Sequence, residues 1–460
     1  MWGIELNRQS EQPLKRQIYQ ELKERIMRGQ LQSDDALPST RELSQDLGVA
    51  RNTVGEAYEM LIAEGFVISR QGAPTRVAEG LCLKQPSTAP REFSPPQRRW
   101  KADFGTGRPD LRQFPRFLWQ RLLHQASLEL PIELYGYTGP EGLSALRSEI
   151  AAWLFRNRGL TVSPEDILIT AGATHALHLL ADLLYGKGKK VLMEDPCHQG
   201  MLRTFRFKGC PVAPVPVDAQ GIRTQCLTGG RDVCAVYVTP SHQFPLGGIL
   251  PAARRAALVR FAADHGLYII EDDYDSEFRY CGEPIAPLYA MAPQSVIYVG
   301  TFSKSLFPAL RIGYVILPPP LHKRWNSLRT HTDVQNPPFA QAALAEFMRT
   351  RKLDRHVQKM RRIYGQRRQV LLESLKEAFG GAWTAYGDAA GLHVAIDFPE
   401  RRFDGTFRKS CLQRDIRITP VESHCIAKGR HQSKLLIGYG HLEPEEIRNG
   451  VQLLHDCMEK

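Results

Sequence analysis

Between residues 166 and 317, short apolar runs alternate with stretches of helical periodicity, and this alternation constrains the fold most strongly. The runs are DILIT, KKVLME, VCAVYVTP, LYIIED, SVIYVG and GYVIL, with helical patterns such as THALHLLADLLYG and AARRAALVRFAADHG between them. This pattern is typical of an α/β fold with a mostly parallel sheet. Ligands of such sheets bind at the carboxyl ends of the strands, so the residues that follow each run form the candidate site.

The stretch GTFSKSLFPALRIG, residues 300–313, holds a lysine between hydroxyl residues and an arginine. A lysine that forms a Schiff base must be neutral when it attacks, and partial burial favours the neutral amine. Two hydroxyls and a guanidinium can bind a phosphate, because arginine can donate to two oxygens at once. The residues are Lys304, Thr301, Ser303 and Arg311.

Two other strand ends supply partners for the same ligand. Backbone N–H groups at Gly172, Ala173 and Thr174, where a helix begins, can bind its phosphate. Asp272 can keep a pyridine nitrogen protonated, which makes the ring an electron sink. Tyr274 can hydrogen-bond a phenolic oxygen. Together these residues predict a site for pyridoxal 5′-phosphate (PLP), with Lys304 as the catalytic Schiff-base lysine; no metal site is predicted.

The first eighty residues have a different organisation. Residues 13–31 carry an apolar residue every fourth position, from Leu14 to Ile26, which predicts an amphipathic helix. Residues 37–67 predict two more helices separated by Gly48, the first opened by Ser39 and Glu42 in a capping-box pattern, the second with apolar positions that include Ile62. GFVISRQGAPTRVAEG then predicts a β-hairpin around Gly72. This is a helix-turn-helix pattern followed by a wing.

Charge does not locate a nucleic-acid surface. The chain has a net charge of +11, yet residues 1–80 contain 10 Lys and Arg against 12 Asp and Glu. Residues 80–101 are proline-rich and basic, which predicts an extended tether, with phosphate contacts from Arg98, Arg99 and Lys101 as the alternative. Nine scattered cysteines without a CxxC pair, no signal peptide and no membrane-spanning run together favour the cytoplasm.

The N-terminal segment resembles the GntR-type winged helix-turn-helix family, through LPSTREL, GVARNTV, EGFV and the wing tip QGAPTRV. The resemblance implies that DNA is contacted by residues at the start of the recognition helix and at the wing. Arginine near the start of such a helix can bind guanine bidentately in the major groove. The implied DNA-binding residues are Arg41, Arg51, Asn52, Thr53 and, in the minor groove, Gly72.

Residues 102–460 resemble the fold-type I aminotransferases, and the whole chain resembles the MocR/GabR family of PLP-dependent transcriptional regulators. The motifs are FGTGRPDLRQFP, YGYTGPEGLSALR, TAGATHALHLLADLL, EDPCHQG, VTPSHQFPLG, EDDYDSEFRY and GTFSKSLFPALRIGY. The resemblance implies a winged helix-turn-helix domain at 1–79, a linker at 80–101 and an aminotransferase-like domain at 102–460. It also implies a PLP aldimine at Lys304, a domain-swapped head-to-tail homodimer, and Tyr137 at the phosphate of the neighbouring subunit.

Three departures from the aminotransferase pattern bear on activity. His198 stands where an aromatic ring stacks on PLP; an imidazole can stack too, but it also titrates near neutrality. Phe244 replaces the asparagine that holds the ring hydroxyl, and Leu436 replaces the arginine that binds a substrate α-carboxylate, with Arg430, His431 or Lys434 as possible substitutes. These departures favour a regulator of an operator that senses PLP, an amine or an amino acid; the alternative is an active aminotransferase with a DNA-binding head.

Residues 349–368 hold nine Lys and Arg and one Asp. Val357, Met360 and Tyr364 give the stretch a helical apolar stripe. It predicts an amphipathic helix with a solvated basic face, with a second DNA surface as the alternative.

Overall fold

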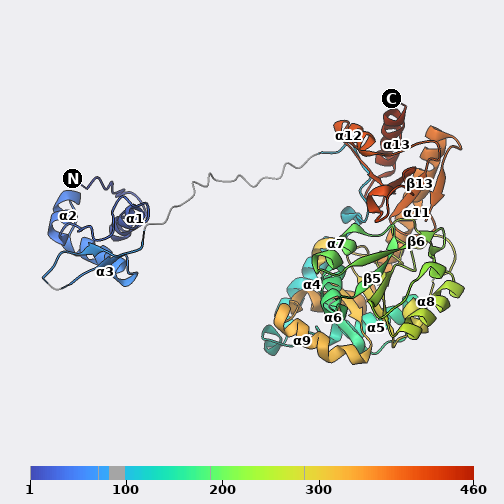
Figure 1. The fold of residues 1–460 in the computed structure, drawn as a ribbon, viewed down its shortest axis with the longest axis horizontal. Helices are drawn as coiled ribbons and strands as arrows, with labels where there is room; N and C mark the ends of the chain where they lie inside the picture. The colour runs from blue at the N-terminus through green and yellow to red at the C-terminus, as the bar shows by residue number, and fades with distance from the viewer. Residues whose placement is uncertain (1, 71, 82–98, 187, 284, 460) are drawn as a thin grey trace. The chain divides into compact units, whose positions relative to one another are not determined.

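The computed structural model describes residues 2–70, 72–81, 99–186, 188–283 and 285–459. The chain separates into two compact units, residues 1–97 and 98–460 (Figure 1). Arg98 and most of the predicted linker lie outside the described residues, so the domain boundaries at 79 and 101 stay predictions. No described helix is both long and apolar enough to cross a membrane.

The first unit has the predicted order of three helices and a hairpin. Its elements are α1 (Leu14–Met27), α2 (Thr40–Leu47), α3 (Arg51–Ala63), β1 (Val67–Ile68) and β2 (Arg76–Val77), with β1 and β2 antiparallel. Ser39 and Glu42 form the predicted capping box, and Gly48 ends α2 in the left-handed conformation. Of the apolar positions predicted for α3, Leu61 is buried, whereas Ile62 is 41% exposed because Leu61 occupies the core-facing position of that turn.

The second unit is built on an eight-stranded sheet in the order β4-β11-β10-β9-β8-β5-β6-β7. Strands β10, β9, β8, β5 and β6 pair in parallel, whereas β11 is antiparallel to both of its neighbours. All six predicted strands are present. The strands are β4 (Ile167–Thr170), β5 (Lys190–Asp195), β6 (Val212–Asp218), β7 (Gly221–Ile222), β8 (Val233–Val238), β9 (Tyr268–Asp273), β10 (Val296–Thr301) and β11 (Gly313–Ile316).

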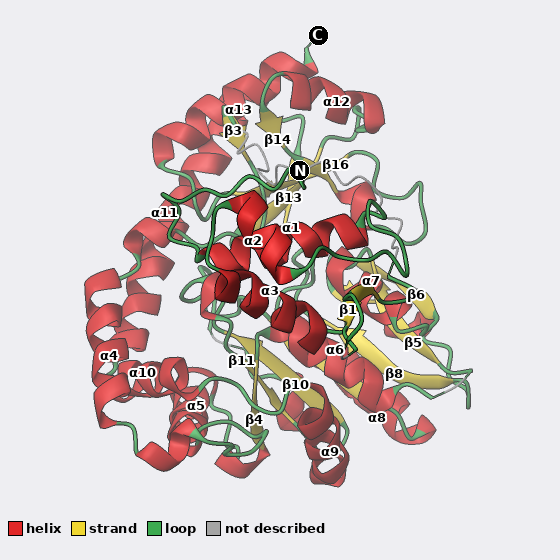
Figure 2. Cartoon of the chain, turned by 90° about the vertical axis from the view of Figure 1, so that its left-hand side faces the viewer, coloured by secondary structure: helices red, strands yellow, loops and turns green. Residues whose placement is uncertain are grey.

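Successive strand residues point into two different cores, which places the sheet between two layers of helices (Figure 2). Ile269 of β9 packs in one core with Leu258 of α8, while its neighbour Ile270 packs in the other with Leu177 of α6. A strand buried on both faces is apolar throughout, which explains the continuous apolar runs of the sequence. The helices around this sheet are α4 (Arg116–Glu129), α5 (Ser144–Arg158), α6 (Ala173–Leu184), α7 (Gln199–Phe207), α8 (Ala252–His265), α9 (His322–Thr332) and α10 (Pro338–Arg349).

The C-terminal part adds a smaller antiparallel sheet in the order β12-β13-β16-β15 and three helices. The short strands β3 (Ala102–Asp103) and β14 (Ile416–Arg417) pair in parallel, so the start of the second unit joins its C-terminal part. The elements are α11 (Lys352–Phe379), β12 (Thr384–Tyr386), β13 (His393–Asp397), α12 (Gly405–Gln413), β15 (Thr419–Pro420), β16 (Lys434–Gly438) and α13 (Pro444–Met458).

The basic stretch 349–368 has the predicted apolar stripe and a largely solvated basic face, but it does not form one continuous helix. It contains the end of α10 and most of α11, separated by Arg351 in the left-handed conformation. Arg367 is buried and bonds to Asp110 at 2.7 Å, so its charge is neutralised within the fold. The predicted stripe of Val357, Met360 and Tyr364 is buried as expected. The remaining exposed cations on this part of α11 are Arg355, Lys359 and Arg362.

Candidate functional site

The ends of β9 and β10 and the start of α6 surround a cavity of about 250 Å³. Its wall includes most of the predicted cofactor residues, although they come from distant parts of the chain. They are Ala173, Thr174, His198, Asp272, Tyr274, Thr301, Ser303, Lys304 and Arg311. Residues from separate strand ends therefore lie together around one cavity.

Two predicted residues are placed differently. Gly172 lies behind the wall, where a Cβ would approach the guanidinium of Arg311 to 3.1 Å. Its φ of 86° and this close approach both require glycine. Tyr137 does not line the cavity, and its side chain is 91% exposed. A role for Tyr137 in this cavity of its own chain is therefore not supported, whereas the role implied by resemblance belongs to a neighbouring subunit.

Lys304 projects its amine into the cavity and donates to the backbone oxygen of Gly107 at 2.7 Å. Burial lowers the pKa of Lys304, and the carboxylates of Asp275 and Asp272 oppose this only in part. A lowered pKa increases the share of neutral amine, which is the reactive form. The environment thus agrees with the role predicted for this lysine.

Asp272 has one satisfied and one unsatisfied oxygen. Tyr237 donates to its Oδ2 at 2.5 Å, whereas its Oδ1 is buried without a hydrogen-bond partner. Burial raises the pKa of Asp272 to about 6, since the hydrogen bond from Tyr237 only partly compensates. A buried, unpaired carboxylate oxygen needs a donor, and the N–H of a protonated pyridine ring is such a group. Asp272 therefore fits the predicted cofactor.

The wall of the cavity also has donors for a phosphate. Thr301 and Ser303 hydroxyls lie 3.0 Å apart, and Arg311, in the left-handed conformation, donates to the backbone oxygen of Ala171. Helix α6 begins at Ala173 without a side-chain cap, so its first N–H groups are available. Hydroxyls, a guanidinium and a free helix N-terminus together form an anion site.

His198 opens onto the cavity with its ring 5.1 Å from that of Phe244. Its Nδ1 accepts a hydrogen bond from the backbone N–H of Gly200. Burial, with a smaller contribution from the charge of Lys304, lowers the pKa of His198 to about 4. The expectation that this imidazole titrates near neutrality is therefore wrong, and the neutral ring can stack like the aromatic residue it replaces.

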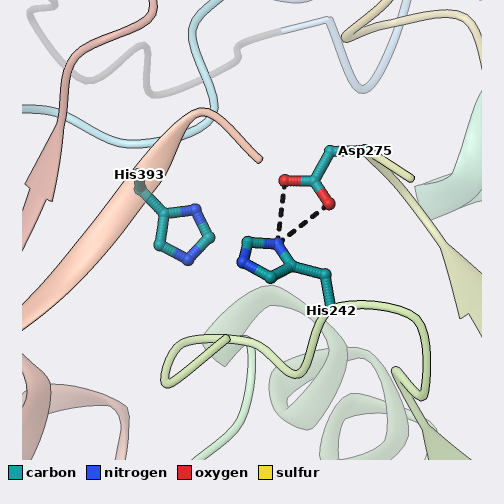
Figure 3. Close-up of side chains that lie close together, drawn as sticks. All are labelled: His242, Asp275 and His393. Atoms are coloured by element: carbon teal, nitrogen blue, oxygen red, sulfur yellow. Dashed lines mark hydrogen bonds and ion pairs between the residues drawn. The ribbon is translucent and has the colours of Figure 1, made fainter. Parts of the chain in front are cut away.

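A histidine–aspartate pair lies beside the cavity (Figure 3). His242 Nδ1 is 3.0 Å from Asp275 Oδ1, and its Nε2 is 3.2 Å from the backbone oxygen of Gly387. Burial alone would lower the pKa of His242, but Asp275 outweighs it and the pKa is raised. The hydroxyl of Tyr274 lies 3.1 Å from His242 Nδ1 and donates to the backbone oxygen of His242 at 3.0 Å. The pair therefore positions Tyr274.

Metal binding is the other chemistry open to this cluster. Possible ligand atoms of His242, Asp275 and His393 all lie within 4.8 Å of one another, and the three residues are buried. Both ring nitrogens of His242 already have oxygen partners, as a protonated imidazole requires. A metal ligand must be a neutral imidazole with a free nitrogen. The geometry is therefore that of a buried ion pair.

Apolar side chains surround the position where aminotransferases have the arginine that binds a substrate α-carboxylate. Leu436 is fully buried in β16 and packs in a cluster with Phe244 and Leu246. Arg430, His431 and Lys434 do not line the cavity, and Lys434 is paired with Asp397 at 2.9 Å. None of the three suggested substitutes thus replaces the arginine within this cavity.

The sequence reasoning missed several residues of the wall. Gly107 lies in the motif FGTGRPD, and Tyr237 is the last residue but one of a predicted strand, so both carried a usable signal. His393 carried none, because only the pairing of β13 with β16 brings it to the cavity. The other unassigned residues of the wall are Thr106, Met201, Thr239, Asp275, Pro308 and Leu392.

The first unit exposes the predicted DNA residues. Arg51 and Asn52 are exposed at the start of α3, Arg41 is exposed on α2, and Gly72 is exposed at the wing with a φ of 80°. Thr53 is half-buried. Arg51 Nε donates to the hydroxyl of Thr40 at 3.1 Å, a contact that was not predicted.

The two helices of this motif have different N-termini. The start of α2 is satisfied by the Ser39 capping box, whereas α3 follows Ala50 and has no side-chain cap. A helix start without a cap leaves N–H groups that can bind a phosphate. Its exposed arginine, asparagine and N–H groups suit α3 for insertion in the major groove.

Two family models match the chain. The model for aminotransferase class I and II matches residues 103–454, and the model for bacterial regulatory proteins of the gntR family matches residues 14–77. Both matches lie within the ranges predicted for the two domains.

Curated relatives match over both parts. A protein named probable rhizopine catabolism regulatory protein MocR, from Rhizobium meliloti, is 31% identical over 98% of this chain and 95% of its own length. The pyridoxine biosynthesis transcriptional regulator PdxR of Corynebacterium glutamicum is 35% identical over 81% of each chain. Among solved structures, an archaeal alanine:glyoxylate aminotransferase is 27% identical and superposes with a TM-score of 0.73, covering 79% of this chain and 91% of that one.

Proposed function

The chain belongs to the family of PLP-dependent transcriptional regulators that join a GntR-type head to an aminotransferase-like domain, and from this we propose that its cavity senses a ligand through Lys304. The observation that carries the proposal is that one cavity contains both groups that PLP needs. They are the partly buried amine of Lys304 and the Asp272 oxygen that has no hydrogen-bond partner. The ligand sensed is an amine, an amino acid or PLP itself.

Each residue of the cavity then has a role. Bound PLP supplies an aldehyde that can bond to an amine and a ring that can withdraw electrons. Asp272 holds the ring-nitrogen proton, and the oxygen of Tyr274, whose O–H donates to the backbone oxygen of His242, can accept a hydrogen bond from the ring hydroxyl. Thr301, Ser303, Arg311 and the start of α6 bind the phosphate. The neutral ring of His198 covers one face of the ligand and excludes water.

A regulatory role is favoured over catalysis by the apolar cluster around Leu436. Without a cation in that position, an amino acid is held less firmly over the ring, and poor orientation slows chemistry. An active aminotransferase is the second candidate, favoured by the retention of Lys304, Asp272 and Arg311 in one wall. Conversion of an added amino acid to its keto acid, measured against Lys304→Ala, distinguishes the two.

We also propose that the regulator acts as a homodimer in the cytoplasm. The second unit exposes several large apolar side chains on α4 and on the segment that follows it. They are Phe117, Leu128, Ile132, Tyr135 and Tyr137, between 50% and 91% exposed. Exposed apolar groups gathered in this way are typical of an interaction surface. A second copy covering this surface would bring Tyr137 to the neighbouring cavity.

DNA binding is tested with genomic fragments selected by the PLP-loaded protein. Arg51→Ala should weaken binding to the selected operator by about 1–3 kcal/mol, the usual contribution of a base contact. Arg28→Ala, which removes an exposed arginine from the end of α1, should leave binding unchanged. Equal binding by wild type and Arg51→Ala would show that α3 is not the recognition helix.

A further inference from the structure

A second, smaller cavity lies behind the wall of the ligand site. It has a volume of about 70 Å³, enough for several water molecules or one small oxyanion. Its lining comes from the end of α5, the segments after β8 and β9, the first half of α11 and the loop that contains Ala390. Nothing in the function proposed above uses this cavity.

The lining contains three guanidinium groups, from Arg158, Arg279 and Arg361. Arg158 is buried, and its charge is neutralised by Asp273 at 2.9 Å. Arg361 donates its Nε to the backbone oxygen of Glu277 at 2.9 Å. Within the described part of the chain, neither Arg361 nor Arg279 forms an ion pair with a carboxylate.

Glu277 does not supply the missing negative charge. It lines the cavity but forms no ion pair with a described basic residue. Burial, together with the nearby charge of Asp273, raises the pKa of Glu277 to about 8, so near neutral pH its carboxyl is mostly protonated. In its protonated form Glu277 can donate a further hydrogen bond.

The rest of the lining is also rich in donors. Buried nitrogens without a hydrogen-bond partner occur on three lining residues, Trp153, Arg158 and Arg279. Gly282, with a φ of 76°, allows the guanidinium of Arg279 to lie directly against the backbone, where a Cβ would approach it to 2.9 Å. Partly buried cations and donors without acceptors favour an anion as their partner.

We propose that this cavity is a second binding site, which takes a small oxyanion of the size and charge of phosphate. A phosphate dianion would neutralise the charges of Arg279 and Arg361 and accept hydrogen bonds from Ser276 and Glu277. The ligand is either the free ion or the phosphate end of a larger molecule. This site is separate from the anion site that Thr301, Ser303, Arg311 and the start of α6 form in the larger cavity.

Among the described residues, the two cavities have no lining residue in common, but residues that line one are chain neighbours of residues beside the other, and we expect this to couple their occupancy. Ser241 and Ser276 line the small cavity, while their chain neighbours His242 and Asp275 form the ion pair that positions Tyr274. Arg158 donates to the hydroxyl of Ser241 at 3.1 Å. An oxyanion that draws on these groups would bias the geometry around the ligand of Lys304, as coupling between sites requires.

The test is calorimetric titration of inorganic phosphate into PLP-saturated full-length protein at constant ionic strength. Because bound PLP occupies the anion site at Arg311 with its own phosphate, saturable binding of inorganic phosphate reports another site. Arg361→Ala and Arg279→Ala should each weaken it about tenfold or more, the effect of losing a charged hydrogen bond. Arg362→Ala removes the exposed neighbour of Arg361 and should bind as the wild type does.

A parallel titration with glycerol 3-phosphate identifies the source of the oxyanion. Tighter binding of the monoester would indicate the phosphate end of a larger molecule, and tighter binding of inorganic phosphate would indicate the free ion. The site is overturned if PLP-saturated wild type binds neither, or if both arginine variants bind as tightly as wild type. Neither result would affect the role proposed for Lys304, which is followed separately by the absorbance of the bound PLP.

Discussion

At the scale of single residues, Gly55 is the clearest departure from local rules. It lies in the middle of α3, on the exposed side that also carries Arg51 and Asn52, and an added Cβ would meet nothing within 4 Å. Gly55→Ala should therefore stabilise the head by about 1 kcal/mol. It should also weaken operator binding, because the methyl group would hold DNA away from α3. Thermal unfolding and fluorescence anisotropy measure the two effects; unchanged or tighter operator binding would contradict this account.

A second residue-scale prediction concerns the pH dependence of His242. Its pKa in the folded protein is raised above the ordinary value of 6.5, so its pairing with Asp275 stabilises the fold fully below pH 6.5. The contribution is lost as pH rises through the folded value. The difference in unfolding free energy between wild type and His242→Gln should thus be largest at low pH and shrink as pH rises. Urea denaturation across pH measures it, with the exposed His124→Gln as control.

A constant difference between wild type and His242→Gln, or one that grows with pH, would rule out the protonated pair. The comparison between two chains removes the contributions of buried acids, such as Glu194 and Glu271, whose pKa values burial raises to about 7. Those acids are common to both proteins and cancel.

At the scale of elements, α11 is not uniformly exposed, because one of its arginines is buried and bonds to distant parts of the second unit. Arg367 bonds to Asp110, to Glu443 and to the backbone oxygen of Gly440, at 2.7, 3.0 and 2.7 Å. Arg367→Met leaves the buried Asp110 with Arg112 as its remaining ion-pair partner and should cost about 1.5–3 kcal/mol of folding free energy, the usual contribution of a charged hydrogen bond. Arg362→Met, on the exposed side of the same helix, should change it by no more than about 0.5 kcal/mol. Similar stabilities of the two variants by urea denaturation would contradict this assignment.

The elements themselves could be predicted because their signals are local. Apolar runs, the Ser39 capping box and Gly48 specify strands, a helix start and a helix end within a few residues. Which cations of residues 349–368 are buried could not be predicted in this way. The partners of Arg367 lie more than seventy residues away, at Asp110 and Glu443, and only tertiary packing determines that this arginine is buried. The same limit applies to His393, which reaches the site through the pairing of two distant strands.

At the scale of the whole molecule, the dimer proposal makes the ligand site a product of two chains. Tyr137 is 91% exposed, so it is free to serve a neighbouring cavity. Tyr137→Ala and Lys304→Ala chains should each fail to hold PLP normally as pure dimers. A mixed dimer should regain one intact site, formed by Lys304 of one chain and Tyr137 of the other. Recovery of about half of the wild-type PLP absorbance per mixed dimer supports this arrangement, and no recovery contradicts it.

The central claim is that Lys304 holds PLP in a cavity that senses rather than converts its ligand, and visible absorbance of the purified protein tests it most directly. The account predicts a band from lysine-bound PLP in the wild type and in the exposed-lysine control Lys323→Ala, and its loss in Lys304→Ala. One amine or amino acid, or further PLP, should shift the band to a new, stable position. No band after PLP is added, or an unchanged band in Lys304→Ala, would contradict the account.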